Sequence, residues 1–168
     1  MADKMKILTF KDTGHVLGIV TIVGDPEGKY EPKDFVGDGF PVRDGVRGTV
    51  GITLKPEVMK VETVDFDPYV LMNPALYCFK DGALSNKPAV QSVTFTSSEL
   101  KVTLSAAPTT EVEVYYRIEG GTSAFTNSDK FTIPTTQDFG KAQLSLGPGV
   151  YYAFVMPKEY RAVLKRKA

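Results

Sequence analysis

Strict alternation of side-chain character over residues 111–118 is the feature that most limits what this chain can fold into. The segment reads Glu-Val-Glu-Val-Tyr-Tyr-Arg-Ile. A β-strand repeats its faces every two residues, whereas a helix repeats about every 3.6 residues. The pattern therefore predicts a strand with one buried face. That face carries Val112, Val114, Tyr116 and Ile118, and the opposite face carries Glu111, Glu113, Tyr115 and Arg117.

The same alternation recurs elsewhere in the C-terminal half and, with the hairpin patterns of the N-terminal half, predicts an all-β fold with antiparallel strands. It is present in Leu100–Leu104 and in Ala142–Leu146. Helical patterns are scarce. Residues 160–164 fit both a helix and a strand, and we favour a strand there.

The N-terminal half predicts two hairpins and one long loop. Lys6–Phe10 and Val16–Val23 flank a Gly-containing turn, and Gly48–Leu54 and Val58–Val64 flank a Pro-containing turn. Residues 24–48 are rich in Gly, Pro and Asp, which is typical of a loop.

A polar stretch with a proline, Ser85-Asn86-Lys87-Pro88, marks an expected domain boundary. We therefore predict a β-rich N-terminal domain over residues 1–87, which includes the loop 24–48. A second domain follows over residues 88–168. A chain of 168 residues accommodates two small domains.

Residues 89–168 resemble immunoglobulin-like modules of the fibronectin type III and Calx-β kinds. Leu146–Tyr152 is similar to the Leu-x-Pro-Gly-x-x-Tyr corner of fibronectin type III domains, and Val102–Pro108 with Val112–Ile118 and Gly120–Thr122 looks like a Calx-β strand-turn-strand. The resemblance implies an immunoglobulin-like β-sandwich after the antiparallel β-rich N-terminal domain. It also implies that Tyr152 is the corner tyrosine, buried and bonded to upstream backbone.

Two departures from these families narrow what the resemblance implies. The chain has no Trp, so the core tryptophan of many fibronectin modules is missing. Asp129 is the lone acid near the bend where Calx-β domains bind calcium. The resemblance therefore implies a fold without calcium binding.

The charge balance disfavours nucleic acid and membrane surfaces as partners. The chain has 20 basic and 20 acidic side chains, so no net field attracts a polyanion. No stretch resembles a signal peptide or a membrane-spanning helix. We expect synthesis in the cytoplasm and leave the final location open, an assembled particle included.

The sequence offers no recognisable catalytic constellation. His15 is the only histidine and Cys78 the only cysteine, and no Gly-x-Ser-x-Gly elbow is present. We interpret His15 as a hairpin residue and Cys78 as a buried apolar residue. The expectation is a protein that is not an enzyme and holds no cofactor.

The acidic residues do not predict a metal site. Asp65 and Asp67 form a spaced pair that runs directly into Pro68. Between residues 25 and 44 the acids are interleaved with Lys and Arg and fit no calcium-binding loop. We interpret the pair as part of a turn that ends a strand, and the acids of residues 25–44 as a solvated loop.

The predicted interaction surface has two parts. On the sheet, Tyr115, Arg117 and Tyr151 are expected to face outward, and in the long loop Asp38, Phe40 and Arg43 are expected to be exposed. Exposed tyrosines favour protein interfaces and can also stack on sugars. We therefore predict a structural or interaction protein that binds a protein partner or itself, as a subunit or adaptor of a larger assembly such as a phage-like particle or surface structure. The alternative is a carbohydrate-binding module.

Overall fold

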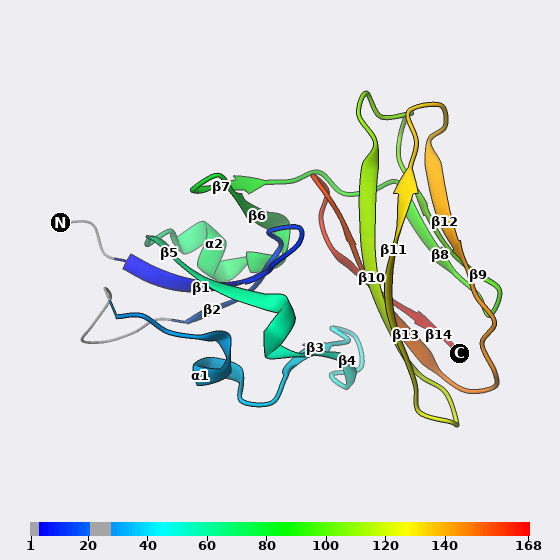
Figure 1. Ribbon diagram of the computed structural model, residues 1–168, viewed down its shortest axis with the longest axis horizontal. Helices are drawn as coiled ribbons and strands as arrows, with labels where there is room; N and C mark the ends of the chain where they lie inside the picture. The colour runs from blue at the N-terminus through cyan, green and yellow to red at the C-terminus, as the bar shows by residue number, and fades with distance from the viewer. Residues whose placement is uncertain (1–3, 21–27) are drawn as a thin grey trace. The chain divides into compact units, whose positions relative to one another are not determined.

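The computed structural model describes residues 4–20 and 28–168 (Figure 1). Its sheets are antiparallel, which confirms the predicted all-β class. The chain divides into two compact units. Unit 1 comprises residues 1–40 and 54–87, and unit 2 comprises residues 41–53 and 88–168. Among the described residues, no helix has the length and apolar character needed to span a membrane.

Unit 1 is built on a three-stranded sheet with the first strand at its centre. β1 (Lys4–Phe10) pairs with β2 (Val16–Val20) on one side and with β5 (Met59–Asp65) on the other. The first predicted hairpin is therefore confirmed over β1 and β2; residues 21–23, predicted to extend it, lie outside the described residues.

The second predicted hairpin is wrong. β5 pairs with β1, and β4 (Val50–Leu54) pairs with β3 (Phe40–Arg43). Pro56 begins a 3-10 turn, η1 (Pro56–Val58), between β4 and β5. That turn redirects the chain, so the two flanking strands join different sheets.

Short elements complete unit 1. They are α1 (Pro32–Val36), α2 (Pro68–Met72), η2 (Pro74–Leu76) and the pair β6 (Tyr77–Lys80) and β7 (Ala83–Asn86). Val70 of α2 is fully buried and joins the core of the sheet, which also contains Met5, Ile7 and Val16. The apolar side chains of β1 thus anchor α2 through one residue of its single turn.

Unit 2 has two sheets that share one core. The larger sheet has the order β11-β10-β13-β14 and the smaller has the order β12-β9-β8. Their strands are β8 (Ser92–Phe95), β9 (Glu99–Thr103), β10 (Val112–Gly120), β11 (Phe125–Ile133), β12 (Phe139–Gln143), β13 (Tyr151–Pro157) and β14 (Val163–Lys167). In the segment 160–164, where we favoured a strand, only residues 163 and 164 belong to β14, and residues 160–162 precede it.

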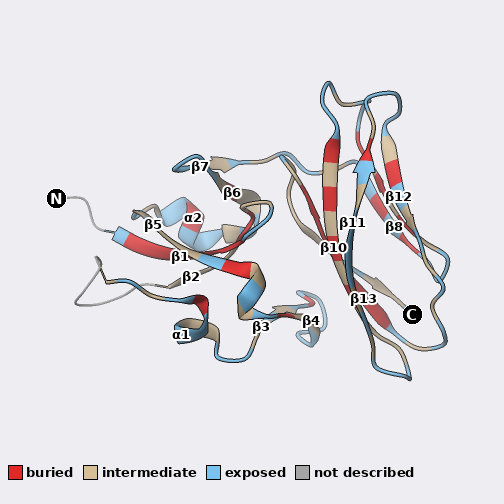
Figure 2. Ribbon diagram, in the orientation of Figure 1, coloured by how far each residue is buried: buried red, intermediate tan, exposed pale blue. Residues whose placement is uncertain are grey.

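The period-two pattern correctly predicts most of this core. Seven residues predicted to be inside are buried in it: Leu100, Val102, Leu104, Val112, Val114, Tyr116 and Ile118. Figure 2 shows the resulting alternation of buried and less buried residues along β10. Leu144 and Leu146, also predicted to be inside, pack against the same core and are partly buried.

The face of β13 that fills this core is the one opposite to our prediction. Tyr151, Ala153 and Val155 belong to the core cluster. Tyr152 and Phe154 are buried as well, but they alternate with the core residues and so lie on the other face of the sheet. Every residue of β13 is buried. A strand that is buried on both faces shows no alternation of polar and apolar residues. The sequence therefore does not indicate which of its alternate side chains face the core.

The loop predicted over residues 24–48 contains regular structure. Its described part holds α1 and β3, while residues 24–27 lie outside the described residues. β3 and β4 form a two-stranded sheet closed by the turn 44–48, and residues 41–53 belong to unit 2. The hairpin that we expected as an N-terminal loop is thus part of the C-terminal unit, whose other segment begins at Pro88.

Candidate functional site

The predicted tyrosine–arginine surface is divided between the two faces of the sheet. Glu119 pairs with Tyr152 and Gly120 pairs with Tyr151, so Tyr115 and Arg117 share a face with Tyr152 and not with Tyr151. Tyr151 is only 1 % exposed. The prediction that Tyr151 is an exposed interaction residue is therefore wrong.

Tyr115 and Arg117 are half-buried and already have partners. The Tyr115 hydroxyl donates to Glu113 at 2.9 Å. Arg117 donates to Glu119 at 2.8 Å and to Ser128 at 3.0 Å. These side chains form a polar network on the surface of their own sheet, so an external partner would have to compete with it.

The corner role assigned to Tyr152 is also corrected. Its hydroxyl donates to Oδ2 of Asp44 at 2.7 Å, in the β3–β4 turn, and not to upstream backbone. Tyr151, one residue earlier, turns into the core against Gly121, where a Cβ would lie 2.3 Å from the tyrosine hydroxyl. Because Gly121 has φ +78°, both the backbone and the space at this position favour glycine.

The Tyr152–Asp44 bond fixes the β3–β4 hairpin to the outer face of the larger sheet. Two further contacts support it. The backbone N–H of Thr53 donates to Glu119 at 2.6 Å, and a Cβ on Gly51 would lie 2.9 Å from Cδ1 of Tyr152. The absence of a side chain at residue 51 thus lets the strand approach the ring closely.

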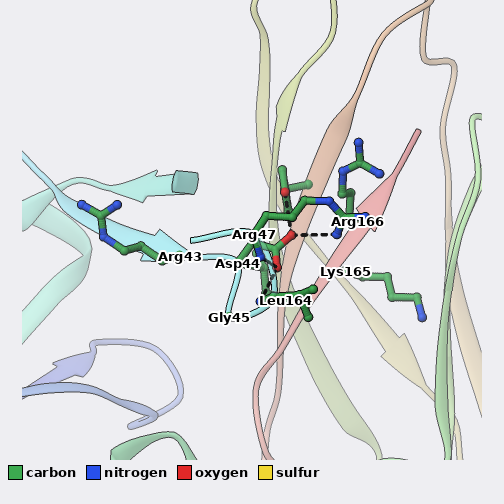
Figure 3. A pocket seen from close by; sticks show the side chains of 9 residues that line it. Arg43, Asp44, Gly45, Arg47, Leu164, Lys165 and Arg166 are labelled. Atoms are coloured by element: carbon green, nitrogen blue, oxygen red, sulfur yellow. Dashed lines mark hydrogen bonds and ion pairs between the residues drawn. The ribbon is translucent and has the colours of Figure 1, made fainter. Parts of the chain in front are cut away.

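A pocket of about 400 Å³ lies where this hairpin meets β14 (Figure 3). Its lining comes from the turn, from β13 and from β14. The residues are Arg43, Asp44, Gly45, Val46, Arg47, Tyr152, Leu164, Lys165 and Arg166. The pocket therefore combines four basic side chains with one acid, one tyrosine and two aliphatic side chains.

Asp44 is the structural centre of the turn. Its Oδ1 accepts the backbone N–H groups of Val46 and Arg47, at 2.8 and 3.1 Å, and its Oδ2 accepts from the Arg47 side chain at 3.2 Å. The hydrogen bond from Tyr152, followed by those from the turn, holds the pKa of the Asp44 carboxyl well below its usual range. Asp44 is therefore ionised at neutral pH, and both of its carboxylate oxygens accept hydrogen bonds from groups of the turn.

Of the three predicted loop residues, one lines the pocket. Arg43 is exposed and donates to the Gly48 carbonyl at 3.3 Å. Phe40 is half-buried, and its ring lies where it would contact a Cβ on Gly18 of β2; this places it within the packing of unit 1. Asp38 is exposed and does not line the pocket.

His15 and Cys78 are enclosed in unit 1. His15 is 1 % exposed, its Nδ1 contacts the Thr13 hydroxyl, and its backbone forms a bridge with that of Cys78. Cys78 is also buried. Neither side chain is presented to a substrate in solution.

The acidic residues considered as metal ligands lie in separate structural contacts. Asp65 pairs with Lys4, and Asp67 caps α2 by accepting the Tyr69 backbone N–H at 2.9 Å. Asp34 accepts the Glu31 backbone N–H at the start of α1. Within the described ranges, no three His, Cys, Asp or Glu side chains lie close enough to hold a metal ion; Asp25 and Glu27 lie outside those ranges.

An exposed apolar surface on unit 1 was missed by the sequence analysis. We call it the α2 surface; it consists of Phe66, Tyr69, Leu71 and Met72. Tyr69 is 72 % and Met72 is 77 % exposed. They are three residues apart and so share one side of the helical turn, while Val70 points into the core. The run Tyr-Val-Leu-Met resembles any buried segment in composition, so hydrophobicity alone could not reveal which side chains remain outside.

No model of a known protein family matches the chain, and no curated protein matches it.

Proposed function

We propose that this chain is a non-catalytic interaction protein, a subunit or adaptor of a larger protein assembly such as a phage-like particle or surface structure. The observation that carries the proposal is the α2 surface. It exposes an aromatic residue and a methionine on one helical turn, and Tyr, Phe and Met are enriched in protein interfaces. Large exposed apolar side chains that are neighbours, as the three-residue spacing makes Tyr69 and Met72, mark surfaces that another protein covers.

The helical turn that bears this surface is fixed to the rest of unit 1. Its exposed side chains therefore have a defined orientation and do not belong to a loosely held segment. Val70 is fully buried in the core of unit 1, Asp67 caps the first turn, and the Asn73 N–H donates to the Tyr69 carbonyl at 3.1 Å. Tyr69 and Met72 are thus held outward by their neighbours. Pre-organisation of this kind lowers the entropy lost when a partner binds.

The surroundings of the two side chains best suited to nucleophilic or acid–base catalysis support binding over chemistry. His15 and Cys78 are both buried. The neighbouring Thr13 hydroxyl contacts the His15 ring. A catalytic histidine needs to reach the group whose proton it moves, and burial in unit 1 opposes that.

We also propose that unit 2 is an immunoglobulin-like module of the fibronectin type III kind. Seven strands in sheets of three and four, with β10–β11 and β13–β14 in one sheet and β8–β9 and β12 in the other, support this. The chain changes sheet between β9 and β10, between β11 and β12, and between β12 and β13, as Greek-key sandwiches do. Such modules present surfaces and loops to partners, although the fold alone does not determine the function.

A protein partner is favoured over a sugar. The carbohydrate alternative depended on exposed Tyr115 and Tyr151. Tyr151 is in the core, and the Tyr115 ring lies below the ammonium groups of Lys130 and Lys158. Neither ring offers the open face on which a sugar would stack.

The proposal is tested by light scattering after size-exclusion chromatography over a wide range of concentrations. The first partner to test is a second copy of the chain. We expect the wild-type mass to rise with concentration and the double variant Tyr69→Ser/Met72→Ser to remain monomeric, because the exposed side chains that association would bury are gone. The control is Val150→Ser, which removes an exposed apolar side chain of unit 2 and should associate like the wild type.

Two results would contradict the proposal. Equal masses for the wild type and the double variant at every concentration, with equal urea midpoints, would mean that the α2 surface does not drive association. Turnover of a substrate in a broad hydrolase and transferase screen, lost in Asp65→Ala, would place the protein among enzymes.

A further inference from the structure

The pocket between the β3–β4 turn and β14 carries surplus positive charge. Four basic residues line it, Arg43, Arg47, Lys165 and Arg166, against the single acid Asp44. Lys165 pairs with Ala153 of β13, so its side chain projects from the core-facing side of the sheet, whereas Arg166 pairs with Tyr152 and lies on the side of the hairpin. On the hairpin side three cations face one acid, a surplus of two charges if every group is ionised. A concave site with this balance attracts anions.

Asp44 does not neutralise the other cations, because its oxygens are already used. One oxygen accepts two backbone N–H groups of the turn, and the other accepts from Tyr152 and from Arg47. The carboxylate therefore stabilises the turn and offsets Arg47 alone. The Arg47 side chain remains 49 % exposed, so its remaining donors are accessible.

The other three cations have no acidic partner within the part of the chain that the structure describes. Arg43 donates to the neutral carbonyl of Gly48. Lys165 and Arg166 take part in none of the ion pairs formed by the described residues. Arg43, Arg47 and Arg166 place three positive charges around one concavity. These charges repel one another, and a bound anion would relieve that repulsion.

Arg47 and Arg166 are the two guanidinium groups nearest the Asp44 carboxylate, and Arg43 lies at the rim of the pocket. In Figure 3, the Arg47 side chain reaches past the Asp44 carboxylate toward the side where Arg166 lies, while Arg43 and Lys165 point away from the turn in opposite directions. A guanidinium group binds two oxygens of a carboxylate or phosphate through two parallel N–H···O hydrogen bonds. The flexible Arg43 side chain can then add charge.

Hydrogen bonds within the protein fix the backbone at the base of the pocket, without a ligand. The Asp44 N–H donates to the Thr49 carbonyl at 2.8 Å and the Gly48 N–H donates to the Asp44 carbonyl at 2.7 Å. Tyr152 ties the turn to β13, and Leu164 supplies an apolar wall. Arg43 and Arg47 thus start from a fixed backbone, so an anion would order side chains only.

We propose that this pocket binds a multivalent oxyanion, as the phosphate groups or clustered carboxylates of a small molecule. Arg47 and Arg166 hold the oxyanion through paired N–H donors, and Arg43 adds charge from the rim. A volume of about 400 Å³ is that of a small-molecule site. The site lies in unit 2 and is separate from the α2 surface of unit 1, so it does not depend on the proposed protein interface.

The test is isothermal titration calorimetry of the full chain at low salt with pyrophosphate, citrate and chloride. We expect one pyrophosphate or citrate per chain, no saturable heat with chloride, and affinity that falls as salt rises. Arg166→Gln should weaken binding roughly tenfold, as expected for the loss of one charge-assisted contact. Arg166 makes no bond to Asp44, so this variant leaves the turn intact.

Lys141→Gln is the matched control, because it removes one positive charge from β12 of the smaller sheet and should leave the affinity unchanged. Stronger binding of pyrophosphate than of citrate would assign the pocket to phosphate-bearing ligands, and the reverse would assign it to polycarboxylates. The proposal is overturned if neither anion binds. It is also overturned if Arg166→Gln and Lys141→Gln weaken binding equally, since the attraction would then be a general surface effect.

Discussion

Tyr152 shows how one hydroxyl group connects segments far apart in the sequence. It lies 108 positions from Asp44, and their hydrogen bond is buried. The bond stabilises the ionised carboxylate, which in turn accepts the N–H groups that form the turn. One interaction therefore determines both the position of the hairpin and the charge of the pocket floor.

This hydrogen bond makes the free energy of unfolding of unit 2 depend on pH, and the free energy falls as the solution becomes acidic. Because the pKa of Asp44 is lowered by folding, the folded chain takes up a proton less readily than the unfolded chain. The stabilisation is fully present above the ordinary aspartate pKa of about 3.9 and is lost as the pH falls below it toward the folded pKa. Glu113 has a lowered pKa too, first through Tyr115 and then through Lys158 and Lys130, and contributes with the same sign.

We predict that Tyr152→Phe will show a smaller loss of stability in acid than the wild type. The substitution removes the largest cause of the lowered Asp44 pKa and leaves Glu113 untouched. Urea unfolding at neutral pH and at steps below pH 4, about the ordinary range of carboxyl groups, measures the difference. Tyr69→Phe, which changes an exposed tyrosine, should behave like the wild type. If Tyr152→Phe and the wild type show identical pH dependence, the hydrogen bond between Tyr152 and Asp44 contributes nothing to the dependence of stability on pH.

The β3–β4 hairpin is the element on which the pocket depends. Residues 41–53 of the hairpin lie between two segments of unit 1 in the sequence but belong to unit 2. Gly51 allows the close approach to Tyr152, since a Cβ there would lie 2.9 Å and 3.0 Å from ring carbons and 3.1 Å from a methyl group of Leu164. The ring cannot retreat easily because β13 is buried on both faces.

We expect Gly51→Ala to lower the free energy of unfolding by about 1–3 kcal/mol, the usual range for overpacking a well-filled site. The added methyl group would push the hairpin from the sheet. Gly45→Ala is the control within the same hairpin, since nothing lies within 4 Å of its Cβ position, and it should be close to neutral. Chemical denaturation of both variants measures the effect. Equal stability of the two would show that the hairpin is not closely packed on Tyr152.

The sequence predicts elements well where one face is polar and poorly where both are buried. Alternation in residues 112–118 predicts the core face of β10 correctly. On β13 no alternation distinguishes the faces, so the corner analogy assigned Tyr152 to the core when Tyr151 occupies it. The pocket joins residues 43–47 to 164–166, and local sequence patterns carry no information about such distant pairings. Arg43 could be anticipated as exposed, but its neighbours in space could not.

At the scale of the whole molecule, each unit offers a surface of a different chemical kind. Unit 1 exposes apolar side chains on α2, and unit 2 holds a basic pocket beside its hairpin. The chain thus combines a surface suited to a protein partner with a pocket suited to an anion. Both are formed by side chains that their own units hold in place, and this combination favours a binding role in an assembly.

The most direct measurement of that binding role is the rate of methionine oxidation by dilute peroxide. Met72 is 77 % exposed, whereas Met5, Met59 and Met156 are buried and serve as internal references. Mass spectrometry of the full chain, at low concentration and under conditions where it associates, gives the rate for each methionine. We predict rapid oxidation of Met72 in the dilute chain and strong protection in the associated state, with the buried methionines slow in both. Equal oxidation of Met72 in the two states would contradict association through the α2 surface.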